Sequence, residues 1–155
     1  MYSKLFKNVI SFEPDVLNFN FLQTNVAQNN VTNATLHNKA LSSKPGMVST
    51  VAHSRGCIYT VDGGTIESIQ LDSLNLENID YIKIDVEGHE LDVLKGCENT
   101  IRVNKPVIEF EYNGLADRLF GVKYEDISEF LNKLGYTCVN RIDDNFFYSS
   151  DALNN

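Results

Sequence analysis

The sequence is short of basic residues. Its 155 residues contain 13 Lys and Arg against 21 Asp and Glu, which gives a formal net charge of −8. Affinity for nucleic acid depends largely on clustered Lys and Arg, so this balance excludes a general phosphate-binding surface. We therefore expect no nucleic-acid partner.

Cysteine and long apolar runs are also scarce. Cys57, Cys97 and Cys138 are an odd number at irregular spacing, without a Cys-x-x-Cys pair, which argues against a disulfide framework or a zinc site. Cys97 and Cys138 fall in apolar patterns, so we expect both to pack in the core. Residues 1–7 do not resemble a signal peptide, and no window reaches the roughly 18 apolar residues of a membrane span. These features predict a cytoplasmic protein without membrane contact.

What remains is an ordinary globular composition. The sequence is 43% hydrophobic and 22% charged, which are typical values for a folded domain. A chain of this length can form one sizeable core. We predict a single domain over residues 1–150, followed by a loose tail at residues 151–155.

The most informative stretch is residues 79–90. Its first half is an apolar, β-rich run with acids at its end, and after Gly88 the apolar spacing changes to three and four residues. A strand therefore passes into a helix at this glycine. In open α/β sheets, ligands lie outside the carboxyl ends of such strands. Asp85, Glu87 and His89 are thus candidate site residues.

A second strand, acid and helix occur near the N-terminus. Residues 9–12 read as a strand that ends at Glu13, and Pro14 suits the start of an amphipathic helix. An acid in this position commonly accepts hydrogen bonds from the hydroxyls of a nucleotide ribose. The alternative is that Glu13 only stabilises the N-terminus of the helix.

The other elements alternate along the chain. We expect a strand at residues 34–41, irregular β-hairpins at 47–71, a helix from 90 to about 102, a strand at 107–112, a helix that Gly135 ends, and an antiparallel pair at 136–139 and 146–148. Strands that alternate with helices predict an α/β sheet, mostly parallel, with an antiparallel end.

The strand at residues 107–112 places two acids on one face. Glu109 and Glu111 are two residues apart, so both project to the same side. Two carboxylates on one face are not both buried without partners. Glu111, at the carboxyl end, is the functional candidate, whereas Glu109 lies at an edge or pairs with a Lys or Arg.

Asp85 and Glu87 form a second pair at this spacing. In an extended segment they project to the same side, which suits binding a hard cation or accepting a proton from a hydroxyl. The alternative is that Asp85 caps the helix after Gly88 while Glu87 is solvated.

The histidines offer no metal motif. His89-Glu90 lacks the second His of an HExxH zinc site, and His37 and His53 are isolated and read as surface or core side chains. We predict no bound metal; a divalent cation at the two acids of the signature is the least favoured alternative.

Together these motifs resemble the FkbM family of S-adenosylmethionine-dependent methyltransferases. The resemblance covers residues 8–149 and is carried mainly by the long signature at residues 79–90. The supporting segments follow in the family's order: Phe12-Glu13-Pro14, Ala40-Leu41-Ser42, Leu71-Asp72-Ser73-Leu74, Val93-Leu94-Lys95-Gly96, Lys105-Pro106-Val107-Ile108 and Gly135-Tyr136. The resemblance implies a Rossmann-like class I methyltransferase sheet, mostly parallel with an antiparallel C-terminal pair.

The resemblance also implies a cofactor site for S-adenosyl-L-methionine. Glu13 would hold the ribose, Ala40 and Leu41 would line the adenine, and Asp85 would lie beside the methionine end near the transferable methyl group.

The reaction implied is methylation of a hydroxyl on a carbohydrate or small-molecule acceptor. Its main needs are alignment and a base near the hydroxyl. Asp85, Glu87 or Glu111 is the candidate base, with His89 as the runner-up because its unperturbed pKa lies near neutrality. Our hypothesis favours Glu87 or Asp85.

The sequence departs from the family before Glu13. The family's glycine-rich loop, which cradles the methionine end of the cofactor, and the strand before it have no counterpart there. We expect the first central strand to be missing, because an N-terminal section has been lost. The alternatives are that the two neighbouring strands pair directly, or that the sheet recruits a strand from elsewhere; the expected partners are the missing N-terminal segment or a second copy in a homo-oligomer. The alternative function is a non-catalytic remnant or binding module of the same fold.

Overall fold

The computed structural model describes residues 2–52 and 58–150. The chain divides into two compact units, Met1–Leu41 with Pro45–Ile69, and Ser42–Lys44 with Gln70–Asn155. The predicted tail at residues 151–155 lies outside the described residues, and the single domain expected over residues 1–150 stays a prediction.

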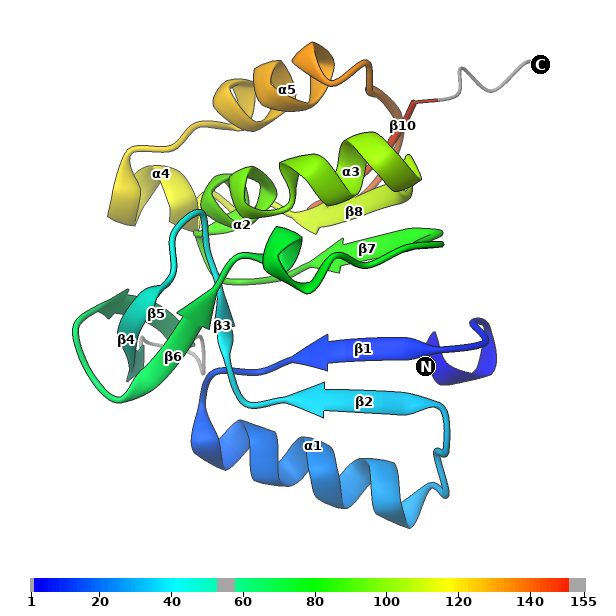
Figure 1. The fold of residues 1–155 in the computed structure, drawn as a ribbon. Helices are drawn as coiled ribbons and strands as arrows, with labels where there is room; N and C mark the ends of the chain where they lie inside the picture. Colours follow the sequence, from blue (N-terminus) through cyan, green and yellow to red (C-terminus); the bar gives the residue numbers. More distant parts are fainter. Residues whose placement is uncertain (1, 53–57, 151–155) are drawn as a thin grey trace. The chain divides into compact units, whose positions relative to one another are not determined.

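The first unit contains a parallel strand–helix–strand motif (Figure 1). After a 3-10 turn, η1 (Tyr2–Lys4), strand β1 (Val9–Phe12) leads through helix α1 (Val16–Gln28) to strand β2 (Ala34–His37), which pairs with β1 in parallel. Parallel neighbours need a crossover connection, and α1 supplies it. The predicted strand and helix are confirmed. Asp15 caps α1 through two backbone N–H groups at 3.0 Å, which satisfies donors that the first turn leaves open.

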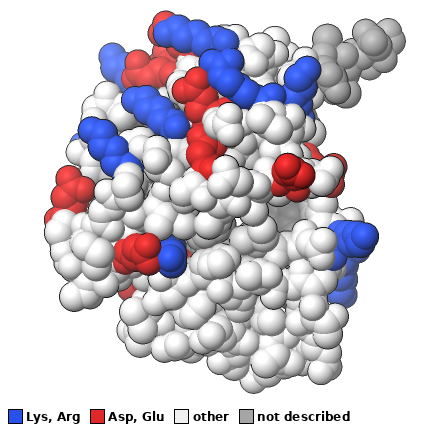
Figure 2. Space-filling model, viewed as in Figure 1, with Lys and Arg blue, Asp and Glu red and all other residues white. Residues whose placement is uncertain are grey.

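Helix α1 has an uncharged surface. It contains no Lys, Arg, Asp or Glu, and the lowest part of the view in Figure 2, where α1 lies in Figure 1, is white. Leu17 and Phe21 are 70% and 68% exposed, whereas Phe19 and Leu22 are half-buried. Without ion pairs along the helix, its stability depends on the Asp15 cap and on the half-buried apolar side.

A second sheet of this unit has the order β3-β6-β4-β5. Strand β4 (Gly46–Ala52) is antiparallel to both β5 (Ile58–Asp62) and β6 (Ile66–Ile69), while β3 (Ala40–Leu41) is parallel to β6. The hairpins expected at residues 47–71 are confirmed for the described residues. The strand expected at residues 34–41 is wrong in its extent, because it divides into β2 and β3 of different sheets.

The sheet of the second unit has the order β7-β8-β10-β9. Strands β7 (Tyr81–Ile84) and β8 (Val107–Glu111) are parallel, and β10 (Asn145–Ser149) is antiparallel to both β8 and β9 (Thr137–Ile142). This confirms the antiparallel C-terminal pair. The prediction of one mostly parallel sheet is wrong. The described strands form three sheets: a parallel pair, β1-β2, and two four-stranded sheets that each contain both parallel and antiparallel pairs. Tight turns such as the one between β9 and β10 permit only antiparallel pairing.

The core of the second unit lies where helices meet this sheet. Helices α2 (Glu90–Gly96), α3 (Glu98–Asn104) and α5 (Tyr124–Lys133) are drawn above β7 and β8 in Figure 1. Several side chains are fully buried, namely Leu94, Cys97, Ile101, Ile108, Phe110, Ile127 and Leu131. The core position expected for Cys97 is confirmed. The one expected for Cys138 is wrong, because Cys138 is exposed on β9, the last strand of the sheet. Cys57 lies outside the described residues.

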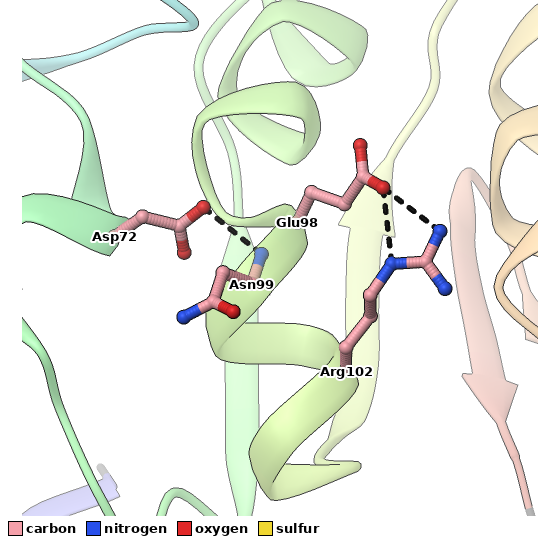
Figure 3. Close-up of polar contacts among 4 residues, drawn as sticks. All are labelled: Asp72, Glu98, Asn99 and Arg102. Carbon is pink, nitrogen blue, oxygen red and sulfur yellow. Dashed lines mark hydrogen bonds and ion pairs between the residues drawn. The ribbon is translucent and has the colours of Figure 1, made fainter.

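The helix expected from residue 90 to about 102 is two helices. Asp72, on the 3-10 helix η3 (Leu71–Leu74), accepts a hydrogen bond from the backbone N–H of Asn99 at 2.9 Å (Figure 3). It also accepts one from the backbone N–H of Thr100 at 2.7 Å. These donors belong to the first turn of α3, so Asp72 caps a new helix from a distance. The apolar spacing continues across the break because both helices face the same core.

Candidate functional site

Glu13 lies directly after β1 in the first unit. Its backbone N–H donates to the His37 carbonyl at 3.0 Å, which extends the pairing of β1 with β2. Its Oε1 accepts the backbone N–H of Asp15 at 2.8 Å. Burial raises the pKa of Glu13, and the hydrogen bond from Asp15 opposes that rise. Asp15 therefore performs the capping, and the Glu13 carboxylate positions the capping residue.

The end of β2 lies beside Glu13. Phe12 and His37 are partners across β1 and β2, and their rings stack with centroids 4.9 Å apart. The Asn38 side-chain amide donates to the Glu13 carbonyl at 2.8 Å. In the sequence His37 is isolated, because its contact with Phe12 depends on the pairing of two strands that are distant along the chain.

The expected adenine-lining residues lie further along the chain. Ala40 and Leu41 form β3 and pair with β6. Ala40 is 4% exposed and Leu41 is half-buried. Their proposed contact with adenine stays a prediction.

In the second unit, Asp85 follows the last residue of β7 and is exposed. The extended geometry assumed for Asp85 and Glu87 is not observed, because Glu87 has a φ of 53° in a turn. Helix α2 begins at Glu90 with His89 as its N-cap and without a side-chain cap, so Asp85 does not cap this helix. This leaves Asp85 accessible at the carboxyl end of the strand.

Glu111 and Asp85 come together at the same sheet edge. Strands β7 and β8 are parallel with Lys83 opposite Glu109, so the residues two positions further along lie at adjacent strand ends. Burial raises the pKa of Glu111, and the charge of Asp85 and a side-chain hydrogen bond with Asp85 raise it further, while Lys83 opposes the rise. Two carboxyl groups this close, joined by a hydrogen bond, are able to share a proton.

Glu109 has a structural explanation. It is 8% exposed, its Oε1 lies 3.1 Å from the Lys83 ammonium, and its other oxygen accepts a short hydrogen bond from the Tyr81 hydroxyl. Lys83 also donates to the Asn145 side chain at 2.6 Å. The prediction that Glu109 is paired with a Lys or Arg is confirmed.

The loop between β7 and α2 is held by residues that the sequence did not single out. Glu90 is 3% exposed and its Oε1 accepts the Gly88 N–H at 2.9 Å. Burial raises the pKa of Glu90, against backbone hydrogen bonds that lower it. The only sequence signal was an acid at the first turn of the helix, which is also typical of a simple interaction with the helix dipole.

A short helix also contacts this loop. Helix α4 (Leu115–Phe120) was not predicted, since six residues between two glycines give too little apolar periodicity. At its start, Asn113 Nδ2 lies 3.5 Å from Glu87 Oε2. At its end, the rings of Phe120 and His89 have centroids 4.2 Å apart. The loop between β7 and α2, with the ends of α4 that contact it, therefore combines carboxylates, an amide and aromatic rings.

Within residues 2–52 and 58–150, no group of three or more His, Cys, Asp and Glu side chains is arranged to hold a metal ion. None of the helices in these ranges combines the length and apolar character that crossing a bilayer requires.

Comparisons with known proteins agree on one family. Residues 3–138 match the methyltransferase FkbM domain. Hexuronic acid methyltransferase AglP from Haloferax volcanii is 31% identical over 136 residues, covering 81% of this chain and 53% of that protein. The chain thus spans about half the length of this curated relative.

A solved structure shows the same fold. The crystal structure of Methyltransferase FkbM from Methylobacillus flagellatus KT matches 93% of this chain and 36% of its own, with a TM-score of 0.64 and 21% identity. The domain match over residues 3–138 shows the family: this chain belongs to the FkbM methyltransferase family.

Proposed function

We propose that this chain transfers a methyl group from S-adenosylmethionine to a hydroxyl oxygen of a carbohydrate or small-molecule acceptor. The observation that carries the proposal is the Asp85–Glu111 pair at the carboxyl ends of adjacent parallel strands, where burial and the charge of Asp85 raise the pKa of Glu111. A relative named as a hexuronic acid methyltransferase supports a sugar acceptor.

The carboxyl pair supplies the base. When bound, S-adenosylmethionine supplies a methyl carbon on a positively charged sulfur, which an oxygen attacks in line. The acceptor hydroxyl gives up its proton during this attack. In this proposal a carboxylate oxygen of Asp85 accepts the hydroxyl proton, and Glu111 is hydrogen-bonded beside it. Because the hydrogen bond joins the two carboxyl groups, the pair acts as one base.

Two other residues are weaker candidates for the base. Glu87 has its Oε2 near the Asn113 amide at 3.5 Å, and its charge contributes to the raised pKa of Glu111. His89 is the runner-up, with its ring against Phe120.

Glu13 suits the ribose of the cofactor. Its carboxylate is half-buried at a strand end, and one oxygen accepts the N–H of Asp15. A carboxylate has about four lone-pair sites, so acceptor capacity remains for ribose hydroxyls. For the adenine we retain Ala40 and Leu41, and Leu41 is the better exposed of the two. In the second unit, Asp85 is the residue proposed for the methionine end.

Calorimetry with S-adenosylmethionine tests the cofactor site. We expect micromolar binding by the 155-residue chain. Glu13→Gln should weaken it about 10- to 100-fold, because a hydrogen bond to a charged group contributes about 1.5–3 kcal/mol. Absence of binding would favour the alternative, a non-catalytic binding module of the same fold.

A methyl-transfer assay with sugar acceptors tests the base. Asp85→Asn and Glu111→Gln should each lower kcat about 10²- to 10⁴-fold, which is the usual contribution of general base catalysis. Glu98→Gln is the matched control, because Glu98 lies on α3 with its side chain 43% exposed, and it should keep full activity. Unchanged turnover in a double alanine variant at Asp85 and Glu87 would show that neither is the base.

A further inference from the structure

Phe120 is a large apolar side chain that the fold leaves at the surface. It ends α4 and is 37% exposed. Moving an aromatic side chain out of water stabilises the fold by about 1.5–3 kcal/mol, so most such side chains lie in the core. Singly exposed apolar side chains are common at protein surfaces, so the neighbours of the Phe120 ring decide whether it has a role.

The ring is placed by close contact with the signature loop. A Cβ on Gly88 would lie only 2.9 and 3.1 Å from two carbons of the Phe120 ring, and Gly88 has a φ of 112°. The ring edge thus lies against bare backbone that only glycine offers. The His89 ring lies on the same loop with its centroid 4.2 Å from that of Phe120 and its plane tilted by 37°.

The other end of α4 contacts the same loop. Asn113 Oδ1 accepts the Leu115 N–H at 2.9 Å, which begins the helix, and Asn113 Nδ2 lies 3.5 Å from Glu87 Oε2. Gly121, with a φ of 67°, ends the helix directly after the ring. Amide, carboxylate and aromatic groups are therefore presented together by two short segments.

This combination matches the chemistry of a sugar ring. A pyranose has hydroxyls around its rim, which carboxylates and amides bind, and a face of C–H groups with partial positive charge. That face is attracted to the negative face of an aromatic ring. Sites for small ligands combine such an apolar wall with a few placed polar groups.

We propose that Phe120, supported by His89, is the platform on which the C–H face of the acceptor sugar lies, with Asn113 and Glu87 contacting its hydroxyls. This inference rests on the proposed function, since it names the part of the site that receives the acceptor. Phe120 is a specificity-determining residue in this role and has no part in the proton transfer.

Titration with methyl glycosides of glucose, galactose and mannose, followed by NMR, tests the platform without the cofactor. We expect millimolar binding to at least one glycoside, with shifts of the Phe120 ring signals. Phe120→Leu keeps an apolar group against Gly88 but lacks the ring, and should weaken binding about three- to tenfold, the usual value of one aromatic contact. Phe120→Tyr keeps the ring and should bind within about twofold of the original chain.

Phe21→Leu is the matched control, because Phe21 is an exposed phenylalanine on α1. It should leave glycoside affinity unchanged. Folding of each variant is checked by thermal unfolding, and the ring signals of the unaltered chain keep the test valid if Phe120→Leu does not fold.

Two results would overturn the proposal: glycosides that bind without shifting the Phe120 signals, or no binding by any glycoside in the panel. Failure of the proposed function is seen separately, as absent cofactor binding or absent methyl transfer with glycoside contacts at Phe120 intact.

Discussion

Gly96 provides a sharp test of the packing in the second unit. It lies at the end of α2, and a Cβ at this position would be 2.0 Å from the Ser42 carbonyl oxygen and 2.8 Å from its carbon. Real Cβ atoms do not approach backbone atoms this closely. Residues 42–44 belong to the second unit, and Ser43 is attached there by hydrogen bonds to Asp92 at 3.0 and 2.5 Å.

Two effects of Gly96→Ala oppose each other. Alanine favours the helix by about 1 kcal/mol relative to glycine. Overpacking costs about 1–3 kcal/mol, and displacement of Ser42 also disturbs the two bonds to Asp92, each contributing about 1 kcal/mol. Since the obstacle is backbone and cannot rotate away, we expect a net loss of about 1–3 kcal/mol in the free energy of unfolding.

Urea unfolding measures this loss, and hydrogen exchange locates it. The Ser43 amide donates to Asp92, so its exchange should accelerate in Gly96→Ala. Gly46→Ala is the control: nothing lies within 4 Å of a Cβ there, and its stability should stay within about 0.5 kcal/mol of the original. A Gly96→Ala chain at least as stable as the original, with unchanged Ser43 exchange, would refute the reasoning.

Three further predictions concern carboxylates of the second unit. Asp72→Ala removes the remote cap of α3, including the bond from the Thr100 hydroxyl, and should lower the free energy of unfolding by about 1–2 kcal/mol. Glu98→Ala loses only the exposed ion pair with Arg102 (Figure 3), and should lower it by less than about 0.5 kcal/mol. Equal losses in urea unfolding would contradict this comparison. Asp85→Asn removes a neighbouring charge and should lower the pKa of Glu111, measured by NMR titration of the side-chain carbons; an unchanged pKa would mean that the pair is not coupled. For Glu90, burial raises the folded-state pKa above the ordinary 4.5, so its contribution to stability is present below that value and is lost as the pH rises through the folded-state pKa. Glu90→Gln keeps an acceptor for the Gly88 N–H but cannot lose a proton. Thermal unfolding from pH 4 to pH 8 should therefore show the stability of the variant rising relative to that of the original chain as the pH rises. A stability difference that is the same at every pH would contradict this assignment.

The sequence predicted a helix or strand correctly where residues close together in the chain are enough to form it. The strand before Glu13, the helix that Gly135 ends and the C-terminal antiparallel pair were all predicted, and the structure has them. Gly135 has a φ of 85° and its N–H donates to the Asn132 carbonyl, which is the local geometry that a glycine at a helix end predicts. The identity of the acids after β7 and the long signature likewise pointed to the family.

Tertiary structure decided which of these residues meet. Hydrophobic periodicity predicts that a side chain is buried, but it does not predict which partner the side chain contacts. It could not show that Asp72 divides one apolar pattern into α2 and α3, nor that the charge of Asp85 lies close enough to raise the pKa of Glu111. The Phe120 ring on Gly88 depends likewise on a contact between distant segments. The sequence by itself determined the local elements and the family, whereas through-space hydrogen bonds, charges and steric contacts decided how the site is assembled.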